Sequence, residues 1–307
     1  MTIELSHLTL PQGITLSCRS TGAKGRPVLV FLHGFPEAAF VWDDLLLHFA
    51  KPGNGGFRCI APNLRGFEQS SAPTDVGAYR AKHLVQDIAA LIASEALADG
   101  APIEALIAHD WGGAVAWNLA ASQPQLIKKL VIINSPHPGT FLRELQHSPQ
   151  QQAASAYMNF LVRPDAEKLL AEGDFRRLFE FFMPFSEVKG HRGPRMAPPW
   201  LTDDVKAQYR SVWQQGLTGA LNYYRASPLR HSPELAQLVI PPELLNVSLP
   251  TLVLWGMGDI ALPPGLLDGL QDYVPKLQIE RTDGATHWII HEQPALVAQH
   301  LQSYLIA

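Results

Sequence analysis

The sequence predicts an α/β fold in which a mainly parallel, doubly wound sheet is interrupted by a helical insertion. Amphipathic segments alternate with short apolar runs, and such alternation indicates strands and helices in a layered sheet domain. The alternation stops after residue 139 and resumes roughly ninety residues later, a length that fits an inserted helical unit. Nearly continuous apolar runs, typical of strands buried on both faces of a parallel sheet, lie at residues 27–32, 57–61, 103–108 and 130–133.

The first two elements predict an antiparallel hairpin ahead of the parallel strands. Residues 3–10 alternate between apolar and polar, as a half-exposed strand does, and a Pro-Gln-Gly turn separates them from a second alternating run at 14–19. Apolar residues at helical spacing then predict helices at 78–97 and 113–121, between the buried strands.

Beyond the Ser-Pro-His-Pro-Gly stretch at 135–139, the pattern is helical without a clear strand. Strand signals return at 251–255 and 277–280, and a final helix is expected at 294–305. We therefore expect a first part of the sheet domain at 1–138, a helical cap at 139–235, and a second part of the sheet domain at 236–307.

Composition excludes several classes of protein. The chain of 307 residues has 24 Lys and Arg against 28 Asp and Glu, without a basic stripe, so nucleic acid and membrane surfaces are not expected partners. Cys18 and Cys59 lie in strand-like runs and fit neither a disulfide framework nor a zinc site. The first residues do not resemble a signal peptide and no run is long enough to span a bilayer, so we expect a cytoplasmic protein.

A carboxylate stands at the junction of a predicted strand and helix, in A-H-D-W-G at 108–112. A strand, a sharp turn with small neighbours and a helix form a nucleophile elbow, usually Gly-x-Ser-x-Gly. Ala108, Asp110 and Gly112 occupy those three places. The turn would lift Asp110 above the strand ends, where open α/β sheets bind ligands. The alternative is that Asp110 only caps the following helix.

An aspartate in this position suits a particular chemistry. It needs no base to ionise at neutral pH. Its attack on an ester would give an unfavourable anhydride, whereas attack on a saturated carbon bearing a leaving group gives a stable alkyl ester. Epoxides and carbon–halogen compounds are substrates of that kind.

Two further residues complete the order nucleophile, acid, histidine that is typical of this arrangement. Asp259 follows the strand at 251–255, and His287 lies in the loop after the strand at 277–280. Asp259 would orient His287, and His287 would activate water. Alternatively, Asp259 caps a helix before Pro263 and His287 is a histidine of a surface loop.

The loop His33-Gly34-Phe35-Pro36 follows another buried strand. Backbone N–H groups of Phe35 and of Trp111, the residue after the nucleophile, are candidates for an oxyanion hole. His33 and Pro36 belong to the same candidate oxyanion-hole and substrate-binding loop. A plain strand-to-helix turn would also accommodate Gly-x-Pro.

The chain resembles the α/β-hydrolase superfamily, and within it the epoxide hydrolases, over nearly its whole length. The motifs that carry the resemblance are H-G-F-P-E at 33–37, H-D-W-G-G at 109–113 and I-N-S-P-H-P at 133–138. The resemblance implies a mostly parallel eight-stranded sheet with an inserted helical cap. One loop departs from the family: P-N-L-R-G-F-E-Q-S at 62–70 replaces the commoner D-x-R-G-x-G-x-S, through Phe67, Glu68 and Gln69.

Epoxide hydrolases use two cap tyrosines to hold and protonate the epoxide oxygen. The resemblance nominates Tyr224, in L-N-Y-Y-R, rather than Tyr223, and it nominates Tyr157, which precedes Pro164 by seven positions. Ordinary packing in the cap is the alternative for both. The family reaction needs no cofactor and no metal, and His287 and His291 lack the intervening glutamate of H-E-x-x-H. The expected partner is a small apolar epoxide, and the expected assembly is a monomer or homodimer.

Dehalogenases are the alternative within the same branch. In haloalkane dehalogenases a tryptophan at the position of Trp111 binds the halide, with a second donor that Phe35 cannot supply but Trp200 or Trp213 could. Haloacetate dehalogenases have arginines where this chain has Trp111 and Ala114. A non-catalytic, ligand-binding relative is a third interpretation.

Overall fold

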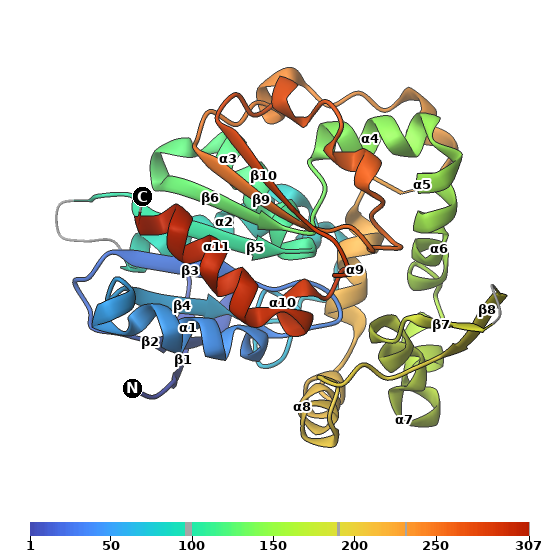
Figure 1. Ribbon diagram of the computed structural model, residues 1–307, viewed down its shortest axis with the longest axis horizontal. Helices are drawn as coiled ribbons and strands as arrows, with labels where there is room; N and C mark the ends of the chain where they lie inside the picture. Colours follow the sequence, from blue (N-terminus) through green and yellow to red (C-terminus); the bar gives the residue numbers. More distant parts are fainter. Residues whose placement is uncertain (96–99, 189–190, 231, 307) are drawn as a thin grey trace.

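A sheet of eight strands forms the centre of the molecule, and the computed structural model describes residues 1–95, 100–188, 191–230 and 232–306 (Figure 1). The strand order is β1-β2-β4-β3-β5-β6-β9-β10; β1 pairs antiparallel with β2, β2 pairs antiparallel with β4, and the other neighbours are parallel. The strands are β1 (Glu4–Thr9), β2 (Thr15–Thr21), β3 (Val28–Leu32), β4 (Arg58–Pro62), β5 (Ile103–His109), β6 (Ile127–Ile133), β9 (Thr251–Gly256) and β10 (Leu277–Thr282).

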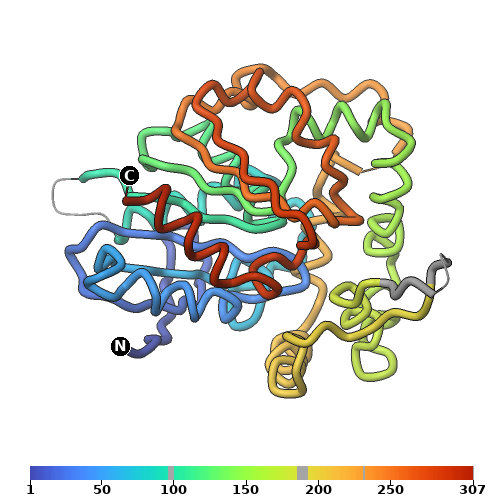
Figure 2. Tube along the Cα trace, in the orientation of Figure 1, coloured from blue at the N-terminus to red at the C-terminus, as the bar shows by residue number. Residues whose placement is uncertain are grey.

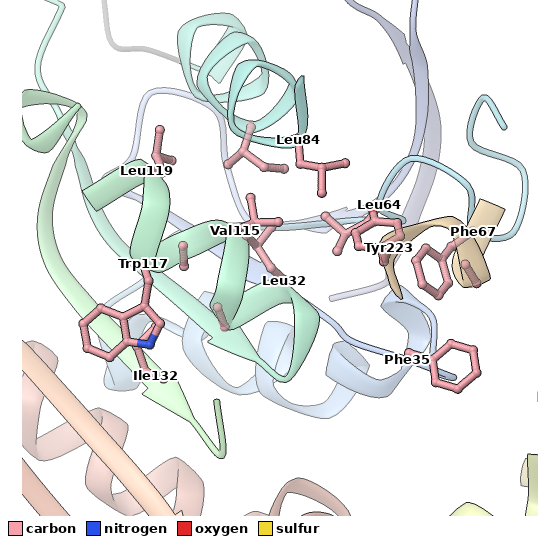
Figure 3. Packing of buried hydrophobic residues seen from close by; sticks show 14 of the residues in the cluster. Leu32, Phe35, Leu64, Phe67, Leu84, Val115, Trp117, Leu119, Ile132 and Tyr223 are labelled. Carbon is pink, nitrogen blue, oxygen red and sulfur yellow. The ribbon is translucent and has the colours of Figure 1, made fainter. Parts of the chain in front are cut away.

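The central strands are apolar because helices cover both faces of the sheet. In β3, Val30 and Leu32 belong to the hydrophobic cluster on one face, whereas Leu29 and Phe31 belong to the cluster on the other. Figure 3 shows the first cluster, with Leu32 beside side chains of α2 and α3. The covering helices are α2 (Ala81–Glu95) and α3 (Trp111–Ser122) on one face, and α1 (Asp43–Ala50), α10 (Ile289–Glu292) and α11 (Pro294–Ile306) on the other.

A mostly helical segment connects β6 to β9. Figure 2 shows most of it on the side of the sheet away from the two chain ends. We call the part from α4 to α9 the helical segment. Its elements are α4 (Pro138–His147), α5 (Pro149–Ala154), α6 (Met158–Leu161), α7 (Ala166–Phe182), β7 (Phe185–Val188), β8 (His191–Arg195), α8 (Asp203–Trp213) and α9 (Thr218–Ala226).

The expectation that this segment lacks strands is wrong, because β7 and β8 pair as an antiparallel hairpin. The sequence His-Arg-Gly-Pro-Arg of β8 contains two residues that are unfavourable inside a sheet. A two-stranded hairpin tolerates them, since each of its strands has an unpaired edge. The division of the chain at residues 138 and 235 stays a prediction.

The predicted strands and helices are present, with shifted boundaries. The strand β6 begins three residues earlier than predicted, and α2 begins at Ala81 because a short 3-10 helix (Val76–Tyr79) precedes it. Residues 96 and 97 of the helix predicted at 78–97 lie outside the described residues. The strand β1 is mostly exposed rather than half-exposed, because it is an edge strand.

Within the described residues, no helix combines the length and the apolar character that crossing a bilayer requires.

Candidate active site

Asp110 occupies a sharp turn between β5 and α3. Its backbone has φ 50° and ψ −122°, a conformation that few non-glycine residues adopt. A Cβ on Gly112 would lie 2.5 Å from the carbonyl oxygen of Leu32, and one on Gly113 would lie 2.3 Å from Cβ of Ser135. Both glycines therefore let α3 begin against the strand ends. The Asp110 side chain makes no capping hydrogen bond, so the interpretation of Asp110 as a helix cap is wrong.

The Asp110 carboxylate is held between a backbone donor and a histidine. Phe35 N–H donates to Oδ1 at 2.7 Å, and Oδ2 lies 3.6 Å from Nε2 of His287. Burial on its own would raise the pKa of Asp110. The hydrogen bond and charge of His287, with a smaller contribution from the Phe35 N–H, hold it below its usual value. The side chain is thus an anion that remains 14% exposed.

Asp259 holds the opposite side of the His287 ring. Nδ1 of His287 donates to Oδ2 of Asp259 at 2.7 Å. Oδ1 of Asp259 accepts the N–H groups of Ala261 and Leu262 at 2.9 and 2.8 Å, so the carboxylate also caps a turn. Burial lowers the pKa of His287, but Asp259 and then Asp110 outweigh it and raise the pKa to about 10. The three side chains therefore form one connected array.

Tyr157 and Tyr224 reach the same place from the helical segment. Their ring centroids are 6.2 Å apart, and the Tyr224 ring lies edge-on at 5.0 Å from Trp111 and 5.3 Å from Phe35. Burial, and then the neighbouring Asp110 charge, raise the pKa of Tyr157. Burial, followed by Tyr157 and Asp110, raises the pKa of Tyr224. Both phenols keep their protons and are hydrogen-bond donors.

Tyr223 has a different position from Tyr224. Its hydroxyl donates to the backbone carbonyl of Arg65 at 2.9 Å, and its ring packs against Phe67 and Tyr79. Its hydroxyl is therefore engaged with the sheet domain, whereas the two nominated tyrosines lie together.

A cavity of about 600 Å³ adjoins these groups. Asp110, Trp111, Tyr157 and Tyr224 are among its polar and aromatic lining residues. A mostly apolar cavity of this volume, with a few polar groups in one place, is typical of a small-molecule site. The rest of its lining is mainly apolar and includes Leu84, Val115, Phe141, Met158, Ile240 and Leu262.

His33, Phe35 and Pro36 of the predicted oxyanion-hole loop are all absent from the lining of this cavity, although the Phe35 N–H donates to Asp110. His33 is fully buried; its Nε2 accepts the Leu64 N–H at 3.1 Å and its Nδ1 donates to the carbonyl of Gly34 at 3.0 Å. Burial lowers the pKa of His33 to about 4, so the ring is neutral. The carbonyl of Pro36 accepts the Trp213 indole N–H at 2.7 Å. Both residues support the loop through these hydrogen bonds, and their role in substrate binding stays a prediction.

Residues 27–294 match the family described as alpha/beta hydrolase fold. The chain belongs to the α/β-hydrolase family. The AB hydrolase superfamily protein YfhM of Bacillus subtilis is 35% identical over 95% of both chains. Human epoxide hydrolase 4 is 30% identical over 95% of this chain and 76% of its own length.

Solved structures agree with this assignment. An epoxide hydrolase from Bacillus megaterium in complex with an inhibitor superposes with a TM-score of 0.85, at 27% identity, over 98% of this chain and all of its own. A metagenomic epoxide hydrolase from a hot environment has a TM-score of 0.82 and 34% identity, over 100% and 99% of the two chains. The predicted fold is confirmed, and the chain is a hydrolase similar to epoxide hydrolases.

Sequence reasoning missed a buried glutamate of this α/β-hydrolase. Glu37 is fully buried and accepts hydrogen bonds from Tyr209 at 2.9 Å and from His291 at 2.5 Å; its other oxygen lies 3.2 Å from Nδ1 of His109. Burial opposes ionisation, but His291 and His109 lower the pKa of Glu37 far below its usual range. Nε2 of His109 donates to the carbonyl of His287 at 2.8 Å. Glu37 therefore links α8 to the loop that carries His287.

Asn134 is the second missed residue. Its Nδ2 donates to Oδ2 of Asp259 at 2.9 Å, and its Oδ1 accepts the Gly256 N–H at 2.9 Å. It holds Asp259 from the neighbouring strand end, at a backbone φ of 39°. Both residues lie in the quoted motifs H-G-F-P-E and I-N-S-P-H-P. Their position after a buried strand was the available signal.

Among the described residues, no group of three or more His, Cys, Asp and Glu side chains is arranged to hold a metal ion.

Proposed function

We propose that this hydrolase converts epoxides to vicinal diols through a covalent ester on Asp110. The main support is the arrangement of an anionic Asp110 beside His287 in a cavity that also receives two protonated tyrosines. The names of its relatives, which include epoxide hydrolases at 30% identity, support the same substrate class. The substrate is a small apolar epoxide, in keeping with the apolar cavity lining.

In the first step, Oδ2 of Asp110 attacks the less hindered ring carbon. The bond between that carbon and the epoxide oxygen, which lies opposite the incoming Oδ2, breaks. The Phe35 N–H holds Oδ1, so Oδ2 is the freer oxygen. The ring oxygen takes the bonding electron pair and receives a hydrogen bond or proton from Tyr157 and Tyr224. Such donation lowers the barrier because negative charge develops on that oxygen.

In the second step, Nε2 of His287 takes a proton from water, and the hydroxide attacks the ester carbonyl of Asp110. The oxyanion develops on Oδ1, where the Phe35 N–H already points, and the Trp111 N–H is the second predicted donor. Collapse of this tetrahedral intermediate breaks the bond between the carboxyl carbon of Asp110 and the ester oxygen, and the diol is released with that oxygen. His287 gives its first proton to the alkoxide or tyrosinate after ring opening and regains one from water. The new Asp110 carboxylic acid protonates the leaving oxygen, so the enzyme is restored and epoxide plus water gives the diol.

The helical segment contributes Tyr157, Tyr224 and part of the cavity wall. These contributions support the prediction that residues 139–235 form a cap. A cap of this kind keeps bulk water from the ester and leaves activation of one water to His287. The cytoplasmic location and the monomeric or homodimeric state remain predictions.

The positions of the candidate halide donors argue against a dehalogenase. The indole N–H of Trp213 donates its hydrogen bond to the carbonyl of Pro36 and is not free to bind a halide. Trp200 stacks on His291 at 4.3 Å and does not line the cavity. The halide of a haloalkane in this cavity could therefore contact Trp111 but neither Trp200 nor Trp213.

Product analysis with a mixed panel of epoxides and haloalkanes tests the proposed function. Styrene oxide and aliphatic terminal epoxides are expected to yield diols, with halide release at background. Halide release with epoxides untouched would select a dehalogenase. Binding of apolar ligands without turnover of either class would select a non-catalytic relative.

Replacing Tyr224 with phenylalanine should slow formation of the Asp110 ester by about 10-fold or more, because one of two donors to the leaving oxygen is lost. The double change with Tyr157→Phe should slow it by at least about 10²-fold. Rapid-quench mass spectrometry of the Asp110 peptide measures this step. Tyr304→Phe is the matched control, since its hydroxyl lies on α11 away from the cavity. Equal rates for Tyr224→Phe and the control would contradict the role of Tyr224.

A further inference from the structure

The loop at residues 62–70, where the chain departs from its family, touches the helix that carries Tyr224. We call it the Gly66 loop. Gly66 in this loop and Gly219 in the first turn of α9 meet backbone to backbone: a Cβ on Gly219 would lie 2.4 Å from Cα and 2.6 Å from the carbonyl oxygen of Gly66. Gly66 also has a left-handed φ of 88°, which favours glycine. Neither position has room for a side chain.

A second contact joins the same loop to the same helix one turn later. The Tyr223 hydroxyl donates to the carbonyl of Arg65, the residue before Gly66. The Tyr223 ring lies 5.4 Å from the ring of Phe67, the residue after it. Figure 3 shows Phe67 and Tyr223 together, with Phe35 nearby. Three successive loop residues thus hold α9 immediately before Tyr224.

The loop is itself fixed to the sheet domain. Arg65 forms a two-pronged salt bridge with Asp87 of α2, at 2.7 and 2.8 Å, and both side chains are almost fully buried. The Leu64 N–H donates to His33, in the loop that supplies the Phe35 N–H to Asp110. The Gly66 loop therefore connects two parts of the site. One is the loop whose Phe35 N–H donates to Asp110, and the other is α9, which carries Tyr224.

The unusual loop residues support this rigid form. Glu68 stands where the family more often has glycine, yet it keeps a left-handed φ of 47° and accepts a hydrogen bond from Asn63. The ring of Phe67 packs edge-on against His33 at 4.8 Å and is buried.

We propose that Gly66 and Gly219 are positioning residues, whose backbone contact sets the distance of Tyr224 from Asp110 during epoxide opening. The inference rests on the proposed function. Hydrogen bonds to a developing oxyanion are effective only within a narrow range of distance. A displacement of α9 moves Tyr224, whereas Asp110, Asp259 and His287 belong to strand ends of the sheet domain and stay in place.

The test is Gly219→Ala, measured by single-turnover rapid quench with styrene oxide. The obstructing atoms are backbone, so no side-chain rotation relieves the clash. Because Arg65 and Leu64 fix the Gly66 loop to the sheet domain, α9 is expected to shift. The rate of ester formation on Asp110 should fall about 10-fold or more. The rate of ester hydrolysis, which uses His287 and Asp259, should change less than about twofold. Gly53→Ala is the matched control, because an added Cβ there meets no atom within 4 Å.

Tyr223→Phe is a milder second variant in case Gly219→Ala does not fold. It removes only the hydrogen bond to Arg65 and should show the same selective loss of ester formation, with smaller size. Unchanged ester formation in a folded variant, or equal loss in both steps, would overturn the inference. If the wild-type enzyme forms no Asp110 adduct with any epoxide, the proposed function itself fails, which is a distinguishable result.

Discussion

Replacing Asp110 with alanine is expected to reduce diol formation by more than about 10⁴-fold, because removal of a covalent nucleophile abolishes the reaction path itself. Tyr157 and Tyr224 could still polarise an epoxide. Among the described residues that line the cavity, however, none besides Asp110 carries a carboxylate. Steady-state product analysis measures the loss. Asp204→Ala, which removes an exposed carboxylate on α8, is the control and should retain activity.

The fate of solvent oxygen separates nucleophilic from general-base roles of Asp110. In a single turnover in heavy-oxygen water, the label should enter the Asp110 carboxylate, and the diol should take its new oxygen from Asp110. Label found only in the diol would mean that water attacks the epoxide directly. In that case Asp110 would serve as a base and the ester mechanism would be wrong.

The sheet and the order of the triad were predictable because both depend on local sequence. Strands buried on two faces appear as apolar runs, and parallel strands bring their carboxyl ends to one edge. Residues that follow β5, β9 and β10 must therefore lie near one another, and the chain order nucleophile, acid, histidine then selects Asp110, Asp259 and His287. The distances between them required the structure.

Long-range contacts could not be read in the same way. Glu37 is an ordinary loop glutamate in the sequence, and its burial depends on partners far along the chain, Tyr209 and His291. The strand β8 forms although its sequence contains Gly and Pro, which are unfavourable in a strand. Only the family resemblance predicts the roles of Tyr157 and Tyr224. The contact between Gly66 and Gly219 joins residues whose proximity no local pattern encodes.

The substitution His287→Gln should arrest the enzyme after the first step, with the Asp110 ester accumulating nearly to the enzyme concentration. Glutamine can keep a polar contact with Asp259 but cannot take a proton from water, so ester hydrolysis should slow by about 10²- to 10⁴-fold. Mass spectrometry of the intact protein and of the Asp110 peptide measures the adduct. An unmodified peptide in the variant, while the wild type turns over, would refute the ester intermediate.

The pH dependence follows from the charge that the first step removes. In the resting enzyme, Asp259 and Asp110 together raise the pKa of His287 to about 10, so His287 is protonated at neutral pH and cannot act as a base. Ester formation neutralises Asp110 and removes its hydrogen bond and charge, so the pKa of His287 falls and the ring gives its proton to the alkoxide or tyrosinate that the first step leaves.

This coupling predicts opposite responses of the two steps to acid. Because the pKa of Asp110 is lowered, ester formation should persist as the pH falls, whereas ester hydrolysis should decline once His287 in the ester is protonated. The wild-type enzyme should therefore accumulate the adduct at acidic pH, as His287→Gln does at every pH. Rapid-quench measurements from pH 5 to pH 9 would detect this; ester formation that fell in parallel with hydrolysis would show that one protonation state of the Asp110–His287 pair governs both steps.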